Sequence, residues 1–395
     1  MSAAGSAAAT RTAPGARVTV SPVEGRADTN AFIRLPYALY RDDPHWVAPL
    51  EREMRAFLDP RRNPTFDTAE IRLLLARRGK AVVGRIAVIS EPRYQERHDF
   101  TCGHFGLFEC ADDTEAAAAL FDAAAGWLAE RGLTRMLGPL SFSVNDECGL
   151  LVDGFDGPPS VGIPYNPPYY PRLLTECGFG KAKDLLSWLV PMPPDGEPPA
   201  GIRRVAERTL SDPSVTVRPL DPARWDDEMA AIKDIYNDAW AENYASVPLT
   251  DQEFRHMAAQ LKAVLKPELV RIAEVDGEPA AFTLWLPDVN QALRPARGRL
   301  TTWGLPVGLL RVTRGMGRIT RVRGGTSGVR KEHRSRGLVA VLLADAQRAA
   351  HRLGYTETDL SWILEDNRGS NRHAQAMGGV HFRTHRLYVR DGGPR

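Results

Sequence analysis

One order of predicted elements occurs twice along this 395-residue chain, and this repeat limits the fold more than any other feature. In the first half, two apolar strands over residues 71–76 and 82–89 flank a tight Gly-Lys turn. In the second half, residues 269–273 and 280–285 flank an Asp-Gly turn in the same way. Apolar runs on either side of such a turn predict a β-hairpin. The chain therefore predicts two hairpins that belong to two similar structural units.

Each predicted hairpin is followed by the same series of elements. A helix that is apolar on one face and ends at a glycine leads into a strand, and a shorter helix then leads into a final strand. These elements cover residues 116–131, 134–143, 170–177 and 185–190 in the first half, and 339–352, 356–364, 371–377 and 385–390 in the second. Strands that alternate with helices predict an α/β (α+β) fold, with a mixed central sheet and helices on both faces in each half.

Two tandem domains account for both the repeat and the length, because 395 residues exceed the usual size of one domain. Five prolines between Pro191 and Pro199 mark the connection. We predict a first domain over residues 17–190, a linker over 191–214 and a second domain over 215–395. Residues 1–16 lack the apolar core of a secretory signal and predict a disordered tail on a cytoplasmic protein.

Charge is distributed unevenly along the chain, although the overall net charge is only +2. Residues 289–337 contain eleven Arg and one Lys against the single acid Glu332, a net +11, so the rest of the chain carries −9. A local excess of this size predicts an anionic partner, such as a phosphate-bearing cofactor, a lipid surface or an acidic carrier protein. No nucleic-acid recognition motif accompanies the arginines, and the four cysteines lack the spacing of metal ligands, so neither nucleic acid nor a metal is expected.

A basic glycine turn joins a short strand ending at Val329 to the helix that follows. Backbone N–H groups at such a junction converge on phosphate oxygens, and the arginines of the turn add positive charge. The spacing Arg334-x-x-Gly337-x-Val339 resembles the diphosphate loop of the GNAT N-acyltransferases, Arg/Gln-x-x-Gly-x-Gly/Ala, with Val339 in place of the last small residue. The residues expected to hold the cofactor are Gly328, Val329, Arg334, Ser335, Arg336, Gly337, Leu338, Val339 and Asn367.

Several longer stretches resemble the tandem-GNAT group that contains the bacterial ceramide synthase-like proteins. They are residues 43–50, 84–87, 103–109, 145–155, 165–170, 236–244, 247–248, 253–254 and 286–290. The resemblance implies transfer of an acyl group from acyl-CoA or acetyl-CoA to an amine, which in ceramide synthesis is a sphingoid base or its keto precursor. It also implies a bulge in the strand before the diphosphate loop, where pantetheine binds exposed backbone, and residues 324–329 have the glycines for it.

The two halves differ at the position of the diphosphate loop. The first half has four acids between Glu109 and Glu115, at the start of its long helix, and these would repel a diphosphate. We therefore expect the first half to have lost coenzyme binding, which leaves scaffolding or a share of the substrate site as its role. A polar run over residues 141–149, after a predicted strand, is the candidate for the second role, and turn formation also explains it.

N-acylation requires a base for the amine and an acid for the leaving thiolate. Glu365 and Asp366 are the first candidate bases because they follow a predicted central strand, although a strand-end turn also explains them, and Asp288 and Glu253 are the next candidates. Many GNAT enzymes carry the acid as a tyrosine in the helix that here covers residues 371–377, which has none. Tyr388 is then the candidate acid, and the alternatives are a water molecule or a thiolate that leaves unassisted. Candidate substrate-binding residues are Trp240, Asn243, Glu253, Asn290 and Asn145.

Residues 287–323 form an insertion longer than a compact GNAT domain requires, with apolar residues interleaved among arginines. This pattern fits a membrane-facing segment, a lid over an acyl chain, or a helix packed on its own domain. The preferred hypothesis is an acyl-CoA-dependent N-acyltransferase for a lipid-like amine, in the cytoplasm and in contact with the inner face of the membrane. The alternatives are an acetyl-CoA-dependent enzyme for small amines, an enzyme that takes its acyl group from an acyl carrier protein, and a non-catalytic binding protein.

Overall fold

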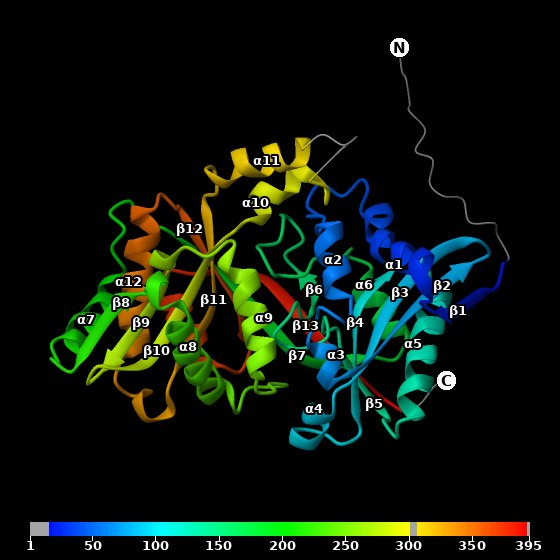
Figure 1. Ribbon diagram of the computed structural model, residues 1–395, viewed down its shortest axis with the longest axis horizontal. Helices are drawn as coiled ribbons and strands as arrows, with labels where there is room; N and C mark the ends of the chain where they lie inside the picture. Colours follow the sequence, from blue (N-terminus) through cyan, green and yellow to red (C-terminus); the bar gives the residue numbers. More distant parts are fainter. Residues whose placement is uncertain (1–15, 301–305, 393–395) are drawn as a thin grey trace, which may run out of the picture.

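The computed structural model describes residues 16–300 and 306–392, so most of the tail expected at 1–16 lies outside the described residues. The strands of both halves form one 13-stranded sheet with the order β1-β2-β3-β4-β5-β13-β7-β12-β11-β10-β9-β8, and β6 pairs with β13 beside this path (Figure 1). The predicted mixed sheet with helices on both faces is confirmed.

The first half contains the following elements in chain order: β1 (Val18–Pro22), α1 (Gly25–Leu39), α2 (Glu51–Phe57), α3 (Thr65–Thr68), β2 (Glu70–Arg78), β3 (Ala81–Ser90), α4 (Pro92–Arg97), β4 (Cys102–Cys110), α5 (Thr114–Ala129), β5 (Arg135–Gly138), β6 (Leu150–Asp153), α6 (Tyr170–Glu176) and β7 (Gly180–Pro191). The predicted hairpin corresponds to β2 and β3.

The second half continues with α7 (Ala200–Leu210), β8 (Val215–Pro219), α8 (Trp225–Trp240), α9 (Asp251–Lys262), β9 (Val270–Val275), β10 (Glu278–Pro287), α10 (Asn290–Leu293), α11 (Val307–Met316), β11 (Arg321–Val329), α12 (Leu338–Arg352), β12 (Glu357–Leu364), α13 (Arg368–Ala376) and β13 (Val380–Asp391). Short 3-10 turns lie at Pro222–Arg224, Pro267–Leu269, Arg294–Ala296 and Lys331–His333. The repeated element order is present in both halves.

Alternate residues of each strand face different helices, which is why near-continuous apolar strands suit this sheet. On β3, Ile86 and Val88 pack in the cluster under α5, whereas Ala87 and Ile89 pack in the cluster under α1. In the second half, α8 and α12 contact β10 in the same two-sided way. Each half is therefore a three-layer unit with its sheet in the middle (Figure 1).

The last strand of each half lies in the sheet of the other half. Strand β13 pairs with β5, with Tyr388 opposite Gly138, and β7 pairs with β12, with Trp188 opposite Leu360. The two exchanged strands also pair with each other in antiparallel fashion. The exchange joins two half-sheets into one, and it could not be read from the repeat, because the element order is the same with or without it.

The segment predicted as a linker, 191–214, contains helix α7, which packs against α12. The Thr209 hydroxyl near the end of α7 donates to the backbone carbonyl of Arg336 at 3.1 Å. This helix therefore supports the loop that precedes α12. The division into domains 17–190 and 215–395 stays a prediction.

Candidate functional site

The neighbouring parallel strands β11 and β12 separate part-way along their length. They pair from Arg321 and Glu357 up to Gly324 and Leu360, and within the described residues the pairing stops there. Strand β11 stays paired with β10 as far as Val329, with a register shift that leaves Gly325 as an extra residue. This bulge turns β11 away from β12, so the backbone of residues 325–329 has no strand partner on its β12 side. We call this backbone the free edge.

The free edge leads directly to the start of α12. Gly337 caps this helix with a φ of 77°, and a Cβ at that position would lie 2.5 Å from Thr209 Oγ1. Only glycine suits this conformation and this contact. Because no side chain caps α12, its first N–H groups are available to an anion.

A cavity of about 310 Å³ adjoins this turn, and its lining residues are Arg208, Thr209, Asp212, Val215, Ser335, Arg336 and Gly337. The charge of Arg336 is balanced by Asp212 at 2.6 Å, whereas Arg334 donates at 3.1 Å to the Ala239 carbonyl at the end of α8. Of the two predicted arginines, Arg334 makes no direct ion pair among the described contacts, although its charge helps to lower the pKa of the nearby Glu242. The structure brings Arg334, Ser335 and Gly337 together at one helix N-terminus.

Aromatic side chains cover the free edge. The indole N–H of Trp240 donates to the Ser327 carbonyl at 3.1 Å, and Trp362 of β12 meets the Trp240 ring edge-on, with 6.1 Å between centroids. Tyr236, one turn earlier on α8, stacks on Trp240. The gap between the two strands is therefore lined by apolar ring surface, and Trp240 lies where the sequence predicts a substrate-binding residue.

A half-buried arginine lies at the point where the two strands separate. Arg323 precedes the bulge, and its guanidinium donates to the Val161 carbonyl at 3.0 Å and to the Ser361 carbonyl at 3.3 Å. Burial lowers the pKa of Arg323, while the charges of Asp359 and Glu147 oppose that shift. Arg323 belongs to the second half and Glu147 to the first, so the guanidinium lies between the two halves.

The loop over residues 141–149 of the first half reaches the same place. Asn145 accepts a hydrogen bond from the Tyr236 hydroxyl, and Asp146 accepts one from the Ser143 hydroxyl at 3.0 Å. Burial raises the pKa of the half-buried Asp146 to about 7, and desolvation also raises the pKa of Glu147, against the effect of Arg323, although Glu147 is exposed. A carboxyl group with a raised pKa is suited to accept a proton near neutral pH.

The predicted catalytic residues are not brought to the free edge. The Glu365 carboxylate pairs with Lys181 at 2.7 Å and accepts from the Asp184 N–H at 3.1 Å, so it faces β7. Tyr388 packs in the core of the first half, because β13 is exchanged into that sheet. Asp288 is buried and accepts from the Val161 N–H at 2.9 Å; burial raises the pKa of Asp288 to about 6. Asp288 therefore holds the segment that also anchors Arg323.

Most of the remaining predicted residues hold the fold together. Glu253 completes a capping box with Thr250 and pairs with Arg93 of the first half at 2.7 Å. Asn290 donates to the Pro159 carbonyl at 3.0 Å, and Asn367 caps α13 through the Ser370 N–H at 3.0 Å. The backbone N–H of Asn243 closes the turn after α8, at 2.9 Å from the Trp240 carbonyl.

Sequence reasoning assigned no role to Arg323, Asp146, Glu147 or Tyr236. Arg323 counted only as part of the basic segment, and the two acids lay within the polar run at 141–149. The available signals were a polar run after a strand and the resemblance over residues 145–155 and 236–244, and neither reveals which strand of the other half the polar run faces.

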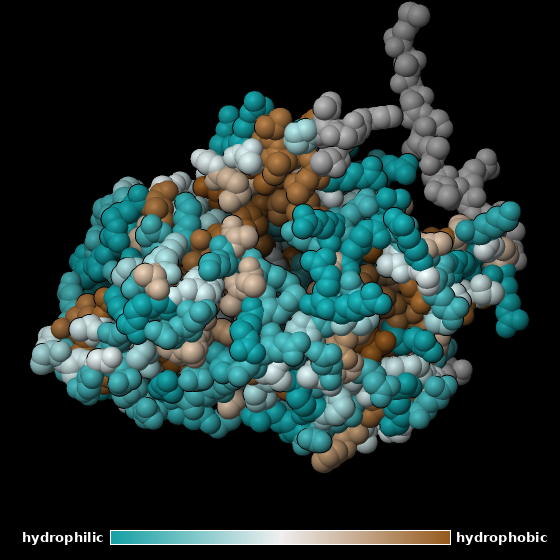
Figure 2. All heavy atoms as spheres, viewed as in Figure 1, coloured by the Kyte–Doolittle hydropathy of each residue, from teal (hydrophilic) through white to brown (hydrophobic). Residues whose placement is uncertain are grey.

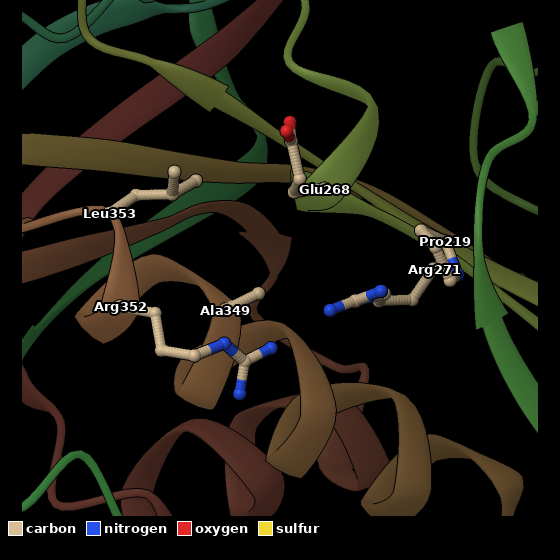
Figure 3. Close-up of a pocket in the computed structure, with 6 residues that line it drawn as sticks. All are labelled: Pro219, Glu268, Arg271, Ala349, Arg352 and Leu353. Atoms are coloured by element: carbon tan, nitrogen blue, oxygen red, sulfur yellow. The ribbon is translucent and has the colours of Figure 1, made fainter.

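A second cavity of about 370 Å³ lies away from the free edge, between β9 and α12, and Figure 3 shows its lining residues Pro219, Glu268, Arg271, Ala349, Arg352 and Leu353. Arg271 pairs with Asp345 at 3.0 Å. Glu268 and Asp345 together balance the charges of Arg271 and Arg352, so this cavity has no excess charge for an ionic ligand.

The described residues contain no cluster of three or more metal-ligand side chains. All four cysteines are buried. None of the helices within the described ranges is both long enough and apolar enough to cross a membrane.

No family model matches the sequence. The chain is 37% identical over 378 residues to the bacterial ceramide synthase of Caulobacter vibrioides, and the alignment covers 94% of this chain and 97% of that protein. The chain belongs to the bacterial ceramide synthase family. Another relative of the family, protein YghO of Escherichia coli, is 34% identical over 365 residues, which cover 91% of this chain and 92% of that protein.

Comparison with solved structures shows that this chain has the fold of tandem GNAT proteins. A tandem GNAT protein from the clavulanic acid biosynthesis pathway superposes with a TM-score of 0.55 at 14% identity, over 96% of this chain and all of that chain (100%). A GCN5-related N-acetyltransferase from Sphaerobacter thermophilus gives 0.52 at 16% identity, over 96% of each chain. The predicted family and fold are confirmed, and this member of the ceramide synthase family is an acyltransferase with the GNAT fold.

Proposed function

We propose that this enzyme transfers a fatty acyl group from acyl-CoA to a long-chain, lipid-like amine of the sphingoid type. The observation that carries the proposal is the free edge of β11 leading into the uncapped start of α12. The relative's name, bacterial ceramide synthase, supports the same substrate class. The reaction is proposed to occur in the cytoplasm, at the inner face of the membrane, where a water-soluble thioester meets a lipid amine.

The second half is proposed to bind the donor. Amide groups of a pantetheine arm can pair with the free edge as an added strand does. The diphosphate then lies at the N–H groups of the α12 N-terminus, next to Arg334. The first half offers no equivalent site, because Asp113 caps α5 and Arg78 pairs with this carboxylate at 2.8 Å.

The first half is proposed to contribute the base for the acceptor. An ammonium acceptor first gives a proton to Asp146 or Glu147, and the neutral amine nitrogen then attacks the thioester carbonyl carbon. The C–N bond forms and the C–S bond breaks. The leaving thiolate then takes up the second proton that the nitrogen loses, which gives the free thiol of coenzyme A. One proton is released to solvent over the whole reaction. The charge of Arg323 favours the ionised form of Glu147 between these events.

The apolar lining favours a long-chain acceptor or acyl group over a small polar one. Trp240 and Trp362 form the sides of the gap, and an apolar cluster from both halves continues below them, with Leu140 and Val144 from the first half and Tyr244 from the second. Aromatic and aliphatic surface of this kind stabilises a hydrocarbon chain by excluding water.

Calorimetry with palmitoyl-CoA and acetyl-CoA tests the donor site, with Gly337→Glu as the variant. Gly354→Glu is the matched control, because Gly354 ends the same helix with a φ of 86° and open space around it. The proposal requires palmitoyl-CoA binding that is lost in Gly337→Glu and kept in Gly354→Glu. Stronger binding of acetyl-CoA would favour the small-amine enzyme. No binding of either thioester would contradict a coenzyme A donor and favour an acyl carrier protein.

Mass spectrometry of the products tests the acceptor. Incubation with palmitoyl-CoA and a sphingoid base is expected to give the amide and free coenzyme A in equal amounts. Amide formed only from short, polar amines would contradict the lipid-like acceptor.

A further inference from the structure

Helix α11 presents apolar side chains to solvent. Leu309, Leu310 and Met316 are 46%, 50% and 38% exposed. Together with exposed Thr313 they recur at the spacing of one helix face. Figure 2 shows hydrophobic atoms gathered over α10 and α11, between the two halves of the molecule. We call these four residues the outer face of α11.

The inner face of the same helix consists of small residues. A Cβ on Gly315 would lie 2.9 Å from the Ala292 backbone, and one on Gly308 would lie 1.9 Å from the Arg299 carbonyl. The helix thus packs on α10 through glycine and turns its leucines away from the protein. Of the alternatives for this insertion, a helix packed on its own domain through its apolar side chains does not fit this arrangement.

The side chains that flank the outer face are basic. Arg314 and Arg318 are exposed, Arg311 is exposed but donates to the Pro295 carbonyl at 3.2 Å, and the chain has no acid between Asp288 and Glu332. A second copy of this chain would bring the same positive charge against itself, which disfavours self-association through this surface. An apolar strip bordered by arginine instead matches a bilayer surface that carries anionic headgroups.

We infer that the outer face of α11 docks on an anionic lipid bilayer. The leucines and Met316 enter the boundary between headgroups and acyl chains, and the arginines lie among the phosphates. Helix α11 precedes β11, whereas the diphosphate loop follows β11, so the two surfaces lie at opposite ends of that strand. This step rests on the proposed function: the lipid amine enters at the α11 end of β11, next to the membrane, and the thioester enters at the diphosphate-loop end, from water.

Vesicle co-sedimentation of the full chain tests the docking surface. The probes are vesicles of phosphatidylglycerol and phosphatidylcholine in equal parts, and vesicles of phosphatidylcholine alone. We expect binding to the anionic vesicles that weakens with added salt, and at least about tenfold weaker binding for Leu309→Asp combined with Leu310→Asp. Val380→Asp is the matched control, because Val380 is an apolar residue 66% exposed on β13, and its vesicle binding should not change.

A second measurement separates the surface from the active site. The double variant should acylate a short, water-soluble amine at the wild-type rate and lose activity only toward an amine embedded in vesicles. Equal vesicle binding by the wild type and the double variant would overturn the inference. So would a double variant that changes only the oligomeric state, or only the affinity for an acyl carrier protein. Vesicle binding that depends on α11, in a protein that acylates no amine, would refute the proposed function and leave the docking surface standing.

Discussion

The indole N–H of Trp240 donates a hydrogen bond to the Ser327 carbonyl at 3.1 Å, on the edge of β11 that faces the gap between β11 and β12. A donor that pairs with this edge must compete with the indole for the same oxygen. Trp240 thus links α8 to the proposed donor site.

Trp240→Phe is expected to bind acyl-CoA about fivefold more tightly, because one competing hydrogen bond of about 1 kcal/mol is removed. Calorimetry with palmitoyl-CoA measures the change. Trp127→Phe, on α5 of the first half, is the control and should bind as the wild type does. Weaker binding by Trp240→Phe would mean that the indole itself contacts the donor.

Gly337→Ala and Gly354→Ala should each destabilise the fold by roughly 1–2 kcal/mol because both glycines have a positive φ, and a steric clash should add to this cost in Gly337→Ala. Only Gly337→Ala also places a methyl group 2.5 Å from Thr209 Oγ1, beside the α12 N-terminus. Urea unfolding measures the stability and calorimetry the affinity. We expect lost acyl-CoA affinity in Gly337→Ala alone; equal affinity in both variants would place the diphosphate elsewhere.

The pH dependence of activity tests the acceptor base. Because burial raises the pKa of Asp146 to about 7, kcat/KM should rise with pH through that value as the carboxylate ionises. Asp146→Asn should lose this step and most of the activity, whereas Glu147→Gln separates the contribution of the neighbouring acid. A rise that persists unchanged in Asp146→Asn would exclude Asp146 as the titrating group.

The same group makes a prediction about stability. A carboxyl whose pKa is higher in the folded protein than in the unfolded chain stabilises the fold fully at pH below about 4, and this contribution is lost as the pH rises through about 7. The melting temperature of the wild type should therefore fall relative to Asp146→Asn across that range. Parallel melting curves for the two proteins would contradict a buried, neutral Asp146.

Glu365→Gln should keep kcat/KM within about twofold of the wild type, since a partly exposed ion pair contributes little. Steady-state kinetics with saturating palmitoyl-CoA measures this. A loss of a hundredfold or more, on the order of a missing general base, would return Glu365 to the active site in place of the acids of the first half.

The sequence predicted the elements well because hairpins and amphipathic helices depend on local patterns. The turn at Gly337 could also be predicted, because a strand, a glycine and the start of a helix follow one another directly in the sequence. The acids Asp146 and Glu147 were not, since their surroundings include Glu253 and Arg323, which lie far away in the chain. Tyr388 was placed near the wrong half for the same reason: β13 follows α13 in sequence but pairs with β5 in space.

Strand β13 is the last element of the described residues, yet it pairs along β5 of the first half. On the ribosome, the first half therefore emerges with an open sheet edge, and this edge stays exposed until β13 has been synthesised. A premature stop codon just before Val380 would leave this edge open for good, although every residue of the first half would be present.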